Sequence, residues 1–281
     1  MATPHFEVSS SARSPSPGEI GAHLEATWQR FRELFDVEPD RVRVVLTTRA
    51  GSDAPTRADQ GGSPARVMAW TVAEGEELGG QGFSDLAHEI AHLYFLDLMG
   101  NPQGLHQDHA WLHEAVACWH ESPRFLAGRE AWIRERLVER TPLAQLFEMR
   151  NPVKEQPLVD LTVKLHGRLA RGEIDVVELN REISAWASGH SQQLMDAGVR
   201  NMTWYAQSLS VFEFLLEREG RACVRQLAAQ LREGARMGEL LARQPHGFGN
   251  LRSFEEQWVH WVGAHAAPTA RRSVPGALPE S

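Results

Sequence analysis

The chain has 281 residues, of which 42% are hydrophobic and 23% charged, enough to bury one large core or two modest ones. Its 29 basic and 37 acidic residues give a formal charge of −8, which argues against nucleic-acid binding, because that needs a basic surface to displace counterions from phosphates. The two cysteines, Cys118 and Cys223, are too few for a disulfide framework or a cysteine-rich zinc module. A metal ion would therefore be held mainly by histidines and carboxylates.

The sequence shows no sign of a membrane span or of a secretion signal. No apolar stretch approaches the roughly 18 residues of a membrane-spanning helix, and the first residues lack the basic and apolar segments of a signal peptide. We therefore expect a cytoplasmic protein that binds no membrane. Both ends are rich in Ser, Pro and Ala, so we expect disordered tails at 1–17 and 266–281.

The first half of the chain contains the only predicted strands. Apolar residues recur every three or four positions over 18–35, which predicts an amphipathic helix. Two short β-branched segments, 41–48 and 65–72, are predicted strands. A second helix is predicted over 84–99, with Ser84 as its N-cap.

From about residue 108 onward, nearly the whole sequence has helical periodicity. The predicted helices cover 109–121, 124–139, 142–149, 156–170, 175–190, 202–219, 221–232 and 252–263. We expect an α+β protein that is mostly α. A small mixed sheet would belong to an N-terminal part, 18–122, packed on a helical part, 123–265.

His88, Glu89 and His92 form a His-Glu-x-x-His pattern inside the predicted helix 84–99. Residues i and i+4 share one helix face, so both imidazoles can bind one zinc ion, while Glu89 projects about 100° around, beside the open coordination position. Zinc polarises a carbonyl and lowers the pKa of water, and a glutamate can take up the proton of that water. The pattern therefore indicates zinc-dependent hydrolysis with Glu89 as general base and acid.

The third zinc ligand is expected from the next helix, which contains Glu114. Two histidines, one glutamate and a water are a standard ligand set for catalytic zinc. The chain can turn back after Gly100 and return antiparallel. A metzincin would place a third histidine six positions after His92, but Leu98 stands there. We therefore expect one zinc ion held by His88, His92 and Glu114.

The two zinc-binding segments, His88-Glu-x-x-His92 and Trp111-Leu-x-Glu114, resemble the gluzincin metallopeptidases. The resemblance is to the peptidase MA-like branch, which is related to aminopeptidase N and thermolysin, and it covers about residues 40–263. It implies a zincin-like fold with an active-site cleft between the two parts. It also implies hydrolysis of a peptide bond.

By the same resemblance, Tyr205 would donate its phenol proton to the oxyanion opposite the zinc, since residues 205–220 are similar to a helix that begins at a tyrosine in that branch. The other tyrosine, Tyr94, lies about 200° around its helix from His92. An ordinary half-buried tyrosine beside Trp204 is the competing interpretation.

The chain departs from thermolysin-like sequences at Cys118, where those enzymes carry an aspartate that orients a zinc-bound imidazole. We expect Asp85 or Glu121 to take that role. The amine-recognition sequence of aminopeptidases is also missing from the strand 65–72. Candidates for an amine anchor beyond that strand are Glu74, Glu76 and Glu77.

The sequence therefore predicts a zinc metallopeptidase that acts on a peptide or protein, with the substrate added as a strand along 65–72. Two alternatives remain open. One is a dedicated biosynthetic or processing hydrolase with a narrow substrate, and the other is a non-catalytic binding protein stabilised by its metal. The oligomeric state also remains open.

Overall fold

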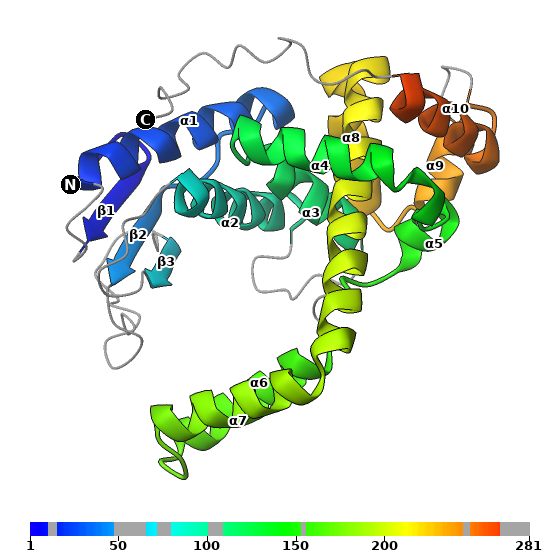
Figure 1. Ribbon diagram of the computed structural model, residues 1–281. Coiled ribbons are helices and arrows are strands. Elements are labelled where there is room, and N and C mark those ends of the chain that lie inside the picture. The colour runs from blue at the N-terminus through cyan, green and yellow to red at the C-terminus, as the bar shows by residue number, and fades with distance from the viewer. Residues whose placement is uncertain are drawn as a thin grey trace.

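The computed structural model describes residues 1–10, 16–47, 66–71, 80–100, 109–152, 156–243 and 248–264. Within these residues the chain is mostly helical and contains one small sheet, which confirms the predicted α+β class at this level (Figure 1). The expected tail at 266–281 and the proposed amine anchors Glu74, Glu76 and Glu77 lie outside the described residues.

The sheet consists of β1 (Phe6–Ser10), β2 (Val42–Thr47) and β3 (Arg66–Thr71), in that order. The second and third strands confirm the predicted ones. The prediction of a mixed sheet is wrong for the described strands, because each pairs in parallel with its neighbour. The prediction of a disordered N-terminal tail is also wrong for β1. Phe6 and Val8 are buried and alternate with polar residues, which is the pattern of a strand with one face on the core. A five-residue strand therefore forms inside a Ser- and Pro-rich segment.

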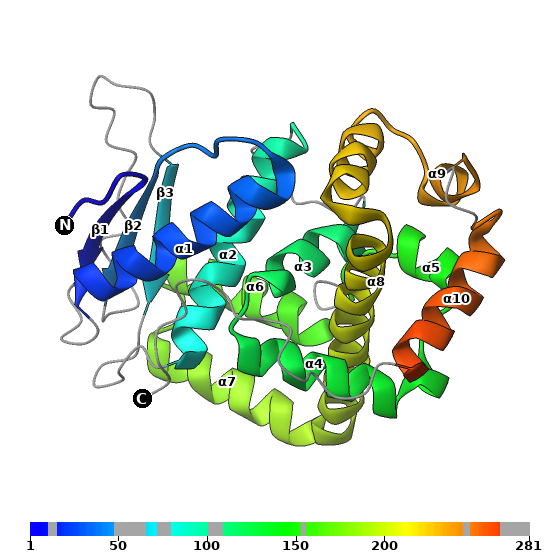
Figure 2. The same cartoon turned by 90° about the horizontal axis from the view of Figure 1, so that it is seen from above.

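The predicted first helix is confirmed as α1 (Pro17–Phe35). It begins with a capping box, in which the Ser16 hydroxyl accepts from the backbone N–H of Glu19 and the Glu19 carboxylate accepts from that of Ser16. The helix lies across the sheet and contacts β1 and α2 (Figure 2). Its apolar stripe, which includes Leu24 and Phe31, is fully buried. The sheet and α1 therefore form the support for the next helix.

The following helix, α2 (Gly80–Leu98), begins four residues before its predicted start. Ser84 is therefore inside the helix, and the predicted N-cap is wrong. Its buried hydroxyl accepts a hydrogen bond of 3.0 Å from the backbone N–H of Ser122 instead. Gly100 has φ 71°, a left-handed conformation that suits glycine at the end of a helix. The next helix, α3 (Ala110–Trp119), packs against α2 and is buried along almost its whole length.

The rest of the described chain is helical. Its elements are α4 (Pro123–Glu135), a 3-10 turn η1 (Leu137–Glu139), α5 (Leu143–Glu148), α6 (Pro157–Ala170), α7 (Val176–Gly189), α8 (Ser191–Arg232), α9 (Met237–Arg243) and α10 (Leu251–Ala264). Two predicted helices, 202–219 and 221–232, are parts of α8, which is kinked at Gly220, where φ is 78°. The sequence did not predict α9.

Helix α8 connects the parts of the molecule. Both α3 and α4 pack against it, and one hydrophobic cluster extends from Phe6 in β1 to Trp258 in α10. The predicted N-terminal and helical parts therefore share a core. Helices α6 and α7 pair with each other around the small core of Leu165, Ile174 and Leu179, and they project sideways from the start of α8 (Figure 1). None of the described helices is both long and apolar enough to cross a membrane.

Candidate metal centre

The predicted ligands come from two helices that pack side by side. His88 and His92 lie one turn apart on α2, so their rings share a face, and Glu114 lies on α3. The Nε2 atoms of the two histidines are 3.1 Å apart. Oε2 of Glu114 is 3.3 Å from Nε2 of His88 and 3.2 Å from Nε2 of His92. The fold therefore brings these three side chains to one point.

These separations fit a tetrahedral zinc ion. Zinc lies about 2.0–2.2 Å from nitrogen and oxygen ligands, so two ligand atoms at neighbouring corners are about 3.3–3.6 Å apart. The three observed separations, 3.1, 3.2 and 3.3 Å, are close to that edge length. Two imidazole nitrogens facing each other at this distance need a proton or a cation between them. Three protein ligands also leave the fourth corner open, as in catalytic zinc sites.

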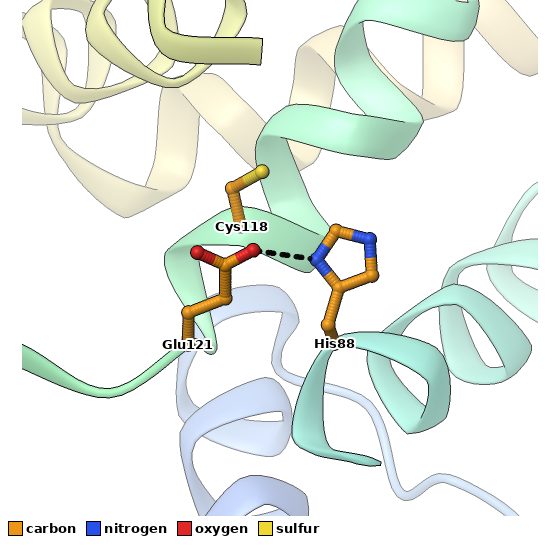
Figure 3. A group of neighbouring side chains, drawn as sticks. All are labelled: His88, Cys118 and Glu121. Atoms are coloured by element: carbon orange, nitrogen blue, oxygen red, sulfur yellow. Dashed lines mark hydrogen bonds and ion pairs between the residues drawn. The ribbon is translucent and has the colours of Figure 1, made fainter. Parts of the chain in front are cut away.

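A buried carboxylate orients the first histidine (Figure 3). Nδ1 of His88 donates a hydrogen bond of 2.9 Å to Oε1 of Glu121. Glu121 also accepts from Arg129, through Nε at 2.8 Å and Nη2 at 2.5 Å. A proton on Nδ1 leaves the lone pair of His88 on Nε2, the atom that faces the other ligands. Of the two residues expected to orient an imidazole, Glu121 does so, whereas Asp85 accepts a hydrogen bond from within α2.

The electrostatics keep the carboxylates of the site ionised. Burial alone would raise the pKa of Glu114, but hydrogen bonds from His88 and His92 outweigh it and hold that pKa well below its usual value. Burial opposes a charge on His88, yet hydrogen bonds with Cys118, Glu114 and Glu121 raise its pKa. An ionised Glu114 is the form that binds a cation.

A second group of possible ligands, His88, Cys118 and Glu121, also lies within 4.8 Å (Figure 3). It suits a metal less well. Burial raises the pKa of the Cys118 thiol, and a thiol must lose its proton to bind metal. Glu121 is already paired with Arg129 and His88. The group of His88, His92 and Glu114 is therefore the better metal site.

The two predicted catalytic residues lie in different surroundings. Glu89 is exposed, and its carboxylate makes no hydrogen bond or ion pair with any residue that the structure describes. Tyr205 is half-buried on α8, with the guanidinium carbon of Arg129 5.2 Å from its ring centroid. Burial and the charge of Glu114 raise the pKa of Tyr205. Its ring also meets that of Trp204 edge to face at 5.2 Å, as the competing interpretation expects.

Sequence reasoning missed two residues of the site. Asn151 is buried between α5 and α6, and its Nδ2 donates a hydrogen bond of 2.6 Å to Oε1 of Glu114. Its only signal in the sequence is an Asn-Pro pair, which is typical of a turn. Arg129 belongs to a run of charged residues, 129–140, of the kind that usually covers a solvated helix face. Its side chain is only 14% exposed, because it pairs with Glu121.

A cavity of about 110 Å³ opens between α6, α7 and α8. Its walls include Pro152, which follows Asn151, and Trp186 of α7. Ala197 and Asn201 of α8 also line it, and Tyr205 follows on the same face of that helix. None of the residues of the candidate metal centre lines this cavity.

Comparison with known proteins finds no matching protein family, no matching curated protein and no matching solved structure. The resemblance to gluzincins therefore depends on the residues of the two zinc-binding segments, and the geometry of the candidate metal centre is the evidence that bears on function.

Proposed function

We propose that this chain is a zinc-dependent metallopeptidase of the gluzincin type, with a zincin-like arrangement of α2 and α3 beside the sheet. The observation that carries the proposal is the convergence of two imidazole nitrogens and one carboxylate oxygen at 3.1–3.3 Å. His88, His92 and Glu114 would hold one zinc ion. The buried Glu121 behind His88 supports this assignment, because zinc-binding histidines usually donate their second N–H to a carboxylate or carbonyl.

The residues around this centre have the chemistry that amide hydrolysis needs. A bound zinc ion polarises the substrate carbonyl and acidifies water. Glu89 accepts the proton of the attacking water and passes it to the leaving nitrogen. Its exposure and lack of partners in the described chain leave its carboxylate free to do so. Tyr205 donates a hydrogen bond to the carbonyl oxygen as that oxygen becomes negative.

The peptide substrate would bind along β3 (Arg66–Thr71). This strand lies at one edge of the described sheet, where it pairs with β2 on one side. The other side can pair with an extended peptide through main-chain hydrogen bonds. The helix α2, which carries the two histidines, is the next described element of the chain.

The structure also bears on the non-catalytic alternative, because Cys118 stands where thermolysin-like enzymes carry the aspartate that orients an imidazole. Glu121 supplies the carboxylate that Cys118 does not, and its hydrogen bond with His88 supports the catalytic proposal over the non-catalytic one. The absence of an aspartate at position 118 therefore no longer argues against catalysis.

The first experiment measures zinc and activity together. The purified chain should bind one zinc ion by mass spectrometry, and His88→Ala should lose it. His166→Ala is the matched control, because this exposed histidine bonds only to its own helix among the described residues. The zinc-loaded chain is then incubated with a mixed peptide library. Cleavage of many peptides supports a general peptidase, and cleavage of very few indicates a dedicated hydrolase. A chain that cannot be loaded with zinc, or that binds it and cleaves nothing, contradicts the proposal.

A further inference from the structure

Arg129 of α4 contacts two groups that belong to different parts of the proposed mechanism. Its side chain is only 14% exposed. Nε and Nη2 donate hydrogen bonds of 2.8 and 2.5 Å to the two carboxylate oxygens of Glu121, and Oε1 of Glu121 also accepts from Nδ1 of His88 at 2.9 Å. The guanidinium carbon of Arg129 lies over the ring of Tyr205 on α8, 5.2 Å from its centroid. One side chain therefore contacts both the group that orients a metal ligand and the proposed oxyanion donor.

The hydrogen bonds between Arg129 and Glu121 fix the direction of that carboxylate. Two N–H groups of one guanidinium that meet the two oxygens of one carboxylate set its orientation as well as its distance. Oε1 accepts from both Arg129 and His88, so a rotation of the carboxylate would disturb both contacts. A lysine at this position would offer a point charge on a flexible stem, without the paired donors. The arginine therefore determines how Glu121 meets the ring of His88.

The ring of Tyr205 is held by Arg129 and by apolar neighbours. It packs against a small buried cluster that consists of Cys118, Leu126 and Leu209. A cation within about 6 Å of the centroid of an aromatic ring is attracted to the face of that ring. Because Glu121 fixes Arg129, this attraction holds the ring in one place. The position of the phenol relative to His88 thus depends on Arg129.

A purely stabilising role explains Arg129 poorly. A buried ion pair contributes little to the stability of a fold, because the desolvation of its charges offsets their attraction. Nη1 of Arg129 is also buried and has no hydrogen-bond partner among the residues that the structure describes. A buried donor without a partner costs free energy. These costs are explained if the side chain serves to orient its neighbours.

We infer that Arg129 is a positioning residue that joins the metal ligand His88, through Glu121, to the phenol of Tyr205. The inference rests on the proposed function for the roles of His88 and Tyr205. A fixed guanidinium keeps these two groups at a constant separation. This matters because an oxyanion donor must already be in place when the negative charge develops on the substrate.

The first test measures zinc affinity by competition with a chelator, which needs no substrate. Arg129→Lys keeps the positive charge and removes the paired donors. Zinc affinity should fall about 10- to 100-fold, the usual effect of changing a group that orients a metal ligand. Arg129→Gln keeps a single donor for Glu121 and should lose affinity as well. It decides the test if the lysine variant does not fold.

Arg136 provides a matched control, because it makes the same two kinds of contact at the surface. Its Nη1 donates to both carboxylate oxygens of Glu139 at 3.0 Å, and its guanidinium carbon lies 4.5 Å from the ring centroid of Trp132. Arg136→Lys should leave zinc affinity unchanged. If the Arg136 and Arg129 variants lose zinc affinity equally, the effect is not specific to Arg129 and the inference is wrong.

A double variant tests whether Arg129 acts on the metal through Glu121. In a chain that already carries Glu121→Gln, the added change Arg129→Lys should lower zinc affinity by no more than about twofold, because the group that Arg129 orients is already altered. A merely structural role of Arg129 predicts instead that the losses of the two single variants multiply. That result would overturn the inference.

The second test observes the ring of Tyr205 directly in the metal-free chain. The sequence has two tyrosines, so Tyr94→Phe leaves Tyr205 alone. With tyrosine labelled with carbon-13 in its ring, NMR then gives the signals of this ring only. Arg129→Gln in this background removes the cation and should move the signals, and Arg136→Gln should not. Unmoved signals, or an unchanged zinc affinity of Arg129→Lys, overturn the inference. Neither measurement depends on hydrolysis, so a failure of the proposed activity is seen separately.

Discussion

Glu121 accepts a hydrogen bond of 2.9 Å from Nδ1 of His88, although 33 positions separate the two residues in the chain. The carboxylate lies two positions after the last residue of α3 and is held in place by Arg129. It orients His88 so that Nε2 faces His92 and Glu114. Glu121 thus provides the carboxylate that thermolysin-like enzymes carry at the position of Cys118.

Replacing this carboxylate tests its importance. Glu121→Gln keeps the size of the side chain but removes the charge that holds the proton on Nδ1 of His88. We expect zinc affinity to fall about 10- to 100-fold in a chelator competition. Glu139→Gln is the control, because it removes an exposed partner of Arg136 and should not change zinc affinity. Equal affinities of wild type and Glu121→Gln would contradict the role given to Glu121.

The general base is tested by Glu89→Gln. The variant keeps His88, His92 and Glu114, so it should bind one zinc ion as the wild type does. Hydrolysis should fall by about 100-fold or more, because the amide cannot accept a proton. Zinc content and peptide cleavage are measured on the same preparation. Retained cleavage would assign the base to another residue.

The proposed oxyanion donor is tested by Tyr205→Phe. The ring remains below Arg129, and only the hydroxyl is lost. We expect kcat to fall about 100-fold with KM nearly unchanged, because the hydroxyl acts only in the transition state. Zinc affinity should stay within a few-fold of the wild type. Unchanged kcat would leave Tyr205 as an ordinary tyrosine beside Trp204.

Unlike Tyr205, Tyr94 has no proposed role for its hydroxyl. Its oxygen is buried and has no hydrogen-bond partner among the described residues. An unsatisfied buried hydroxyl costs free energy, so Tyr94→Phe should leave the free energy of unfolding unchanged or raise it by about 1 kcal/mol. Urea unfolding measures this change. A clear loss of stability would mean that the hydroxyl has a partner.

His23 makes the stability of the metal-free chain depend on pH. Burial lowers the pKa of His23 to about 4, and its Nε2 donates to the carbonyl of Phe83 at 2.9 Å. The unfolded chain binds this proton near pH 6.5 and the folded chain only near pH 4, so stability falls as the pH drops between these values. The loss from pH 7 to pH 5 should be up to about 2 kcal/mol.

His23→Gln keeps a donor for Phe83 and does not titrate. In urea unfolding at pH 7 and pH 5, this variant should lose less stability on acidification than the wild type does. The same dependence in both proteins would show that His23 is not responsible for it.

The sequence by itself determined the elements whose signals are local. The spacing of His88 and His92 indicates a shared helix face, because α-helical periodicity brings residues four apart together. The strands at 42–47 and 66–71 follow from β-branched residues. The composition of residues 1–17 led to the wrong prediction of disorder at β1, because five strand residues are too few to change the average of a Ser- and Pro-rich segment.

Only the tertiary structure decided how the site is completed. Glu121 rather than Asp85 orients His88, because α3 packs beside α2 and ends next to that ring. Asn151 hydrogen-bonds Glu114, which lies 37 positions earlier in the chain. The residues next to Asn151 in the sequence do not predict that contact. Helical periodicity depends on the nearest few residues, whereas contacts of this kind depend on how distant segments pack. The proposed ligands could therefore be predicted from the sequence, whereas the choice between Asp85 and Glu121 and the contact of Asn151 could not.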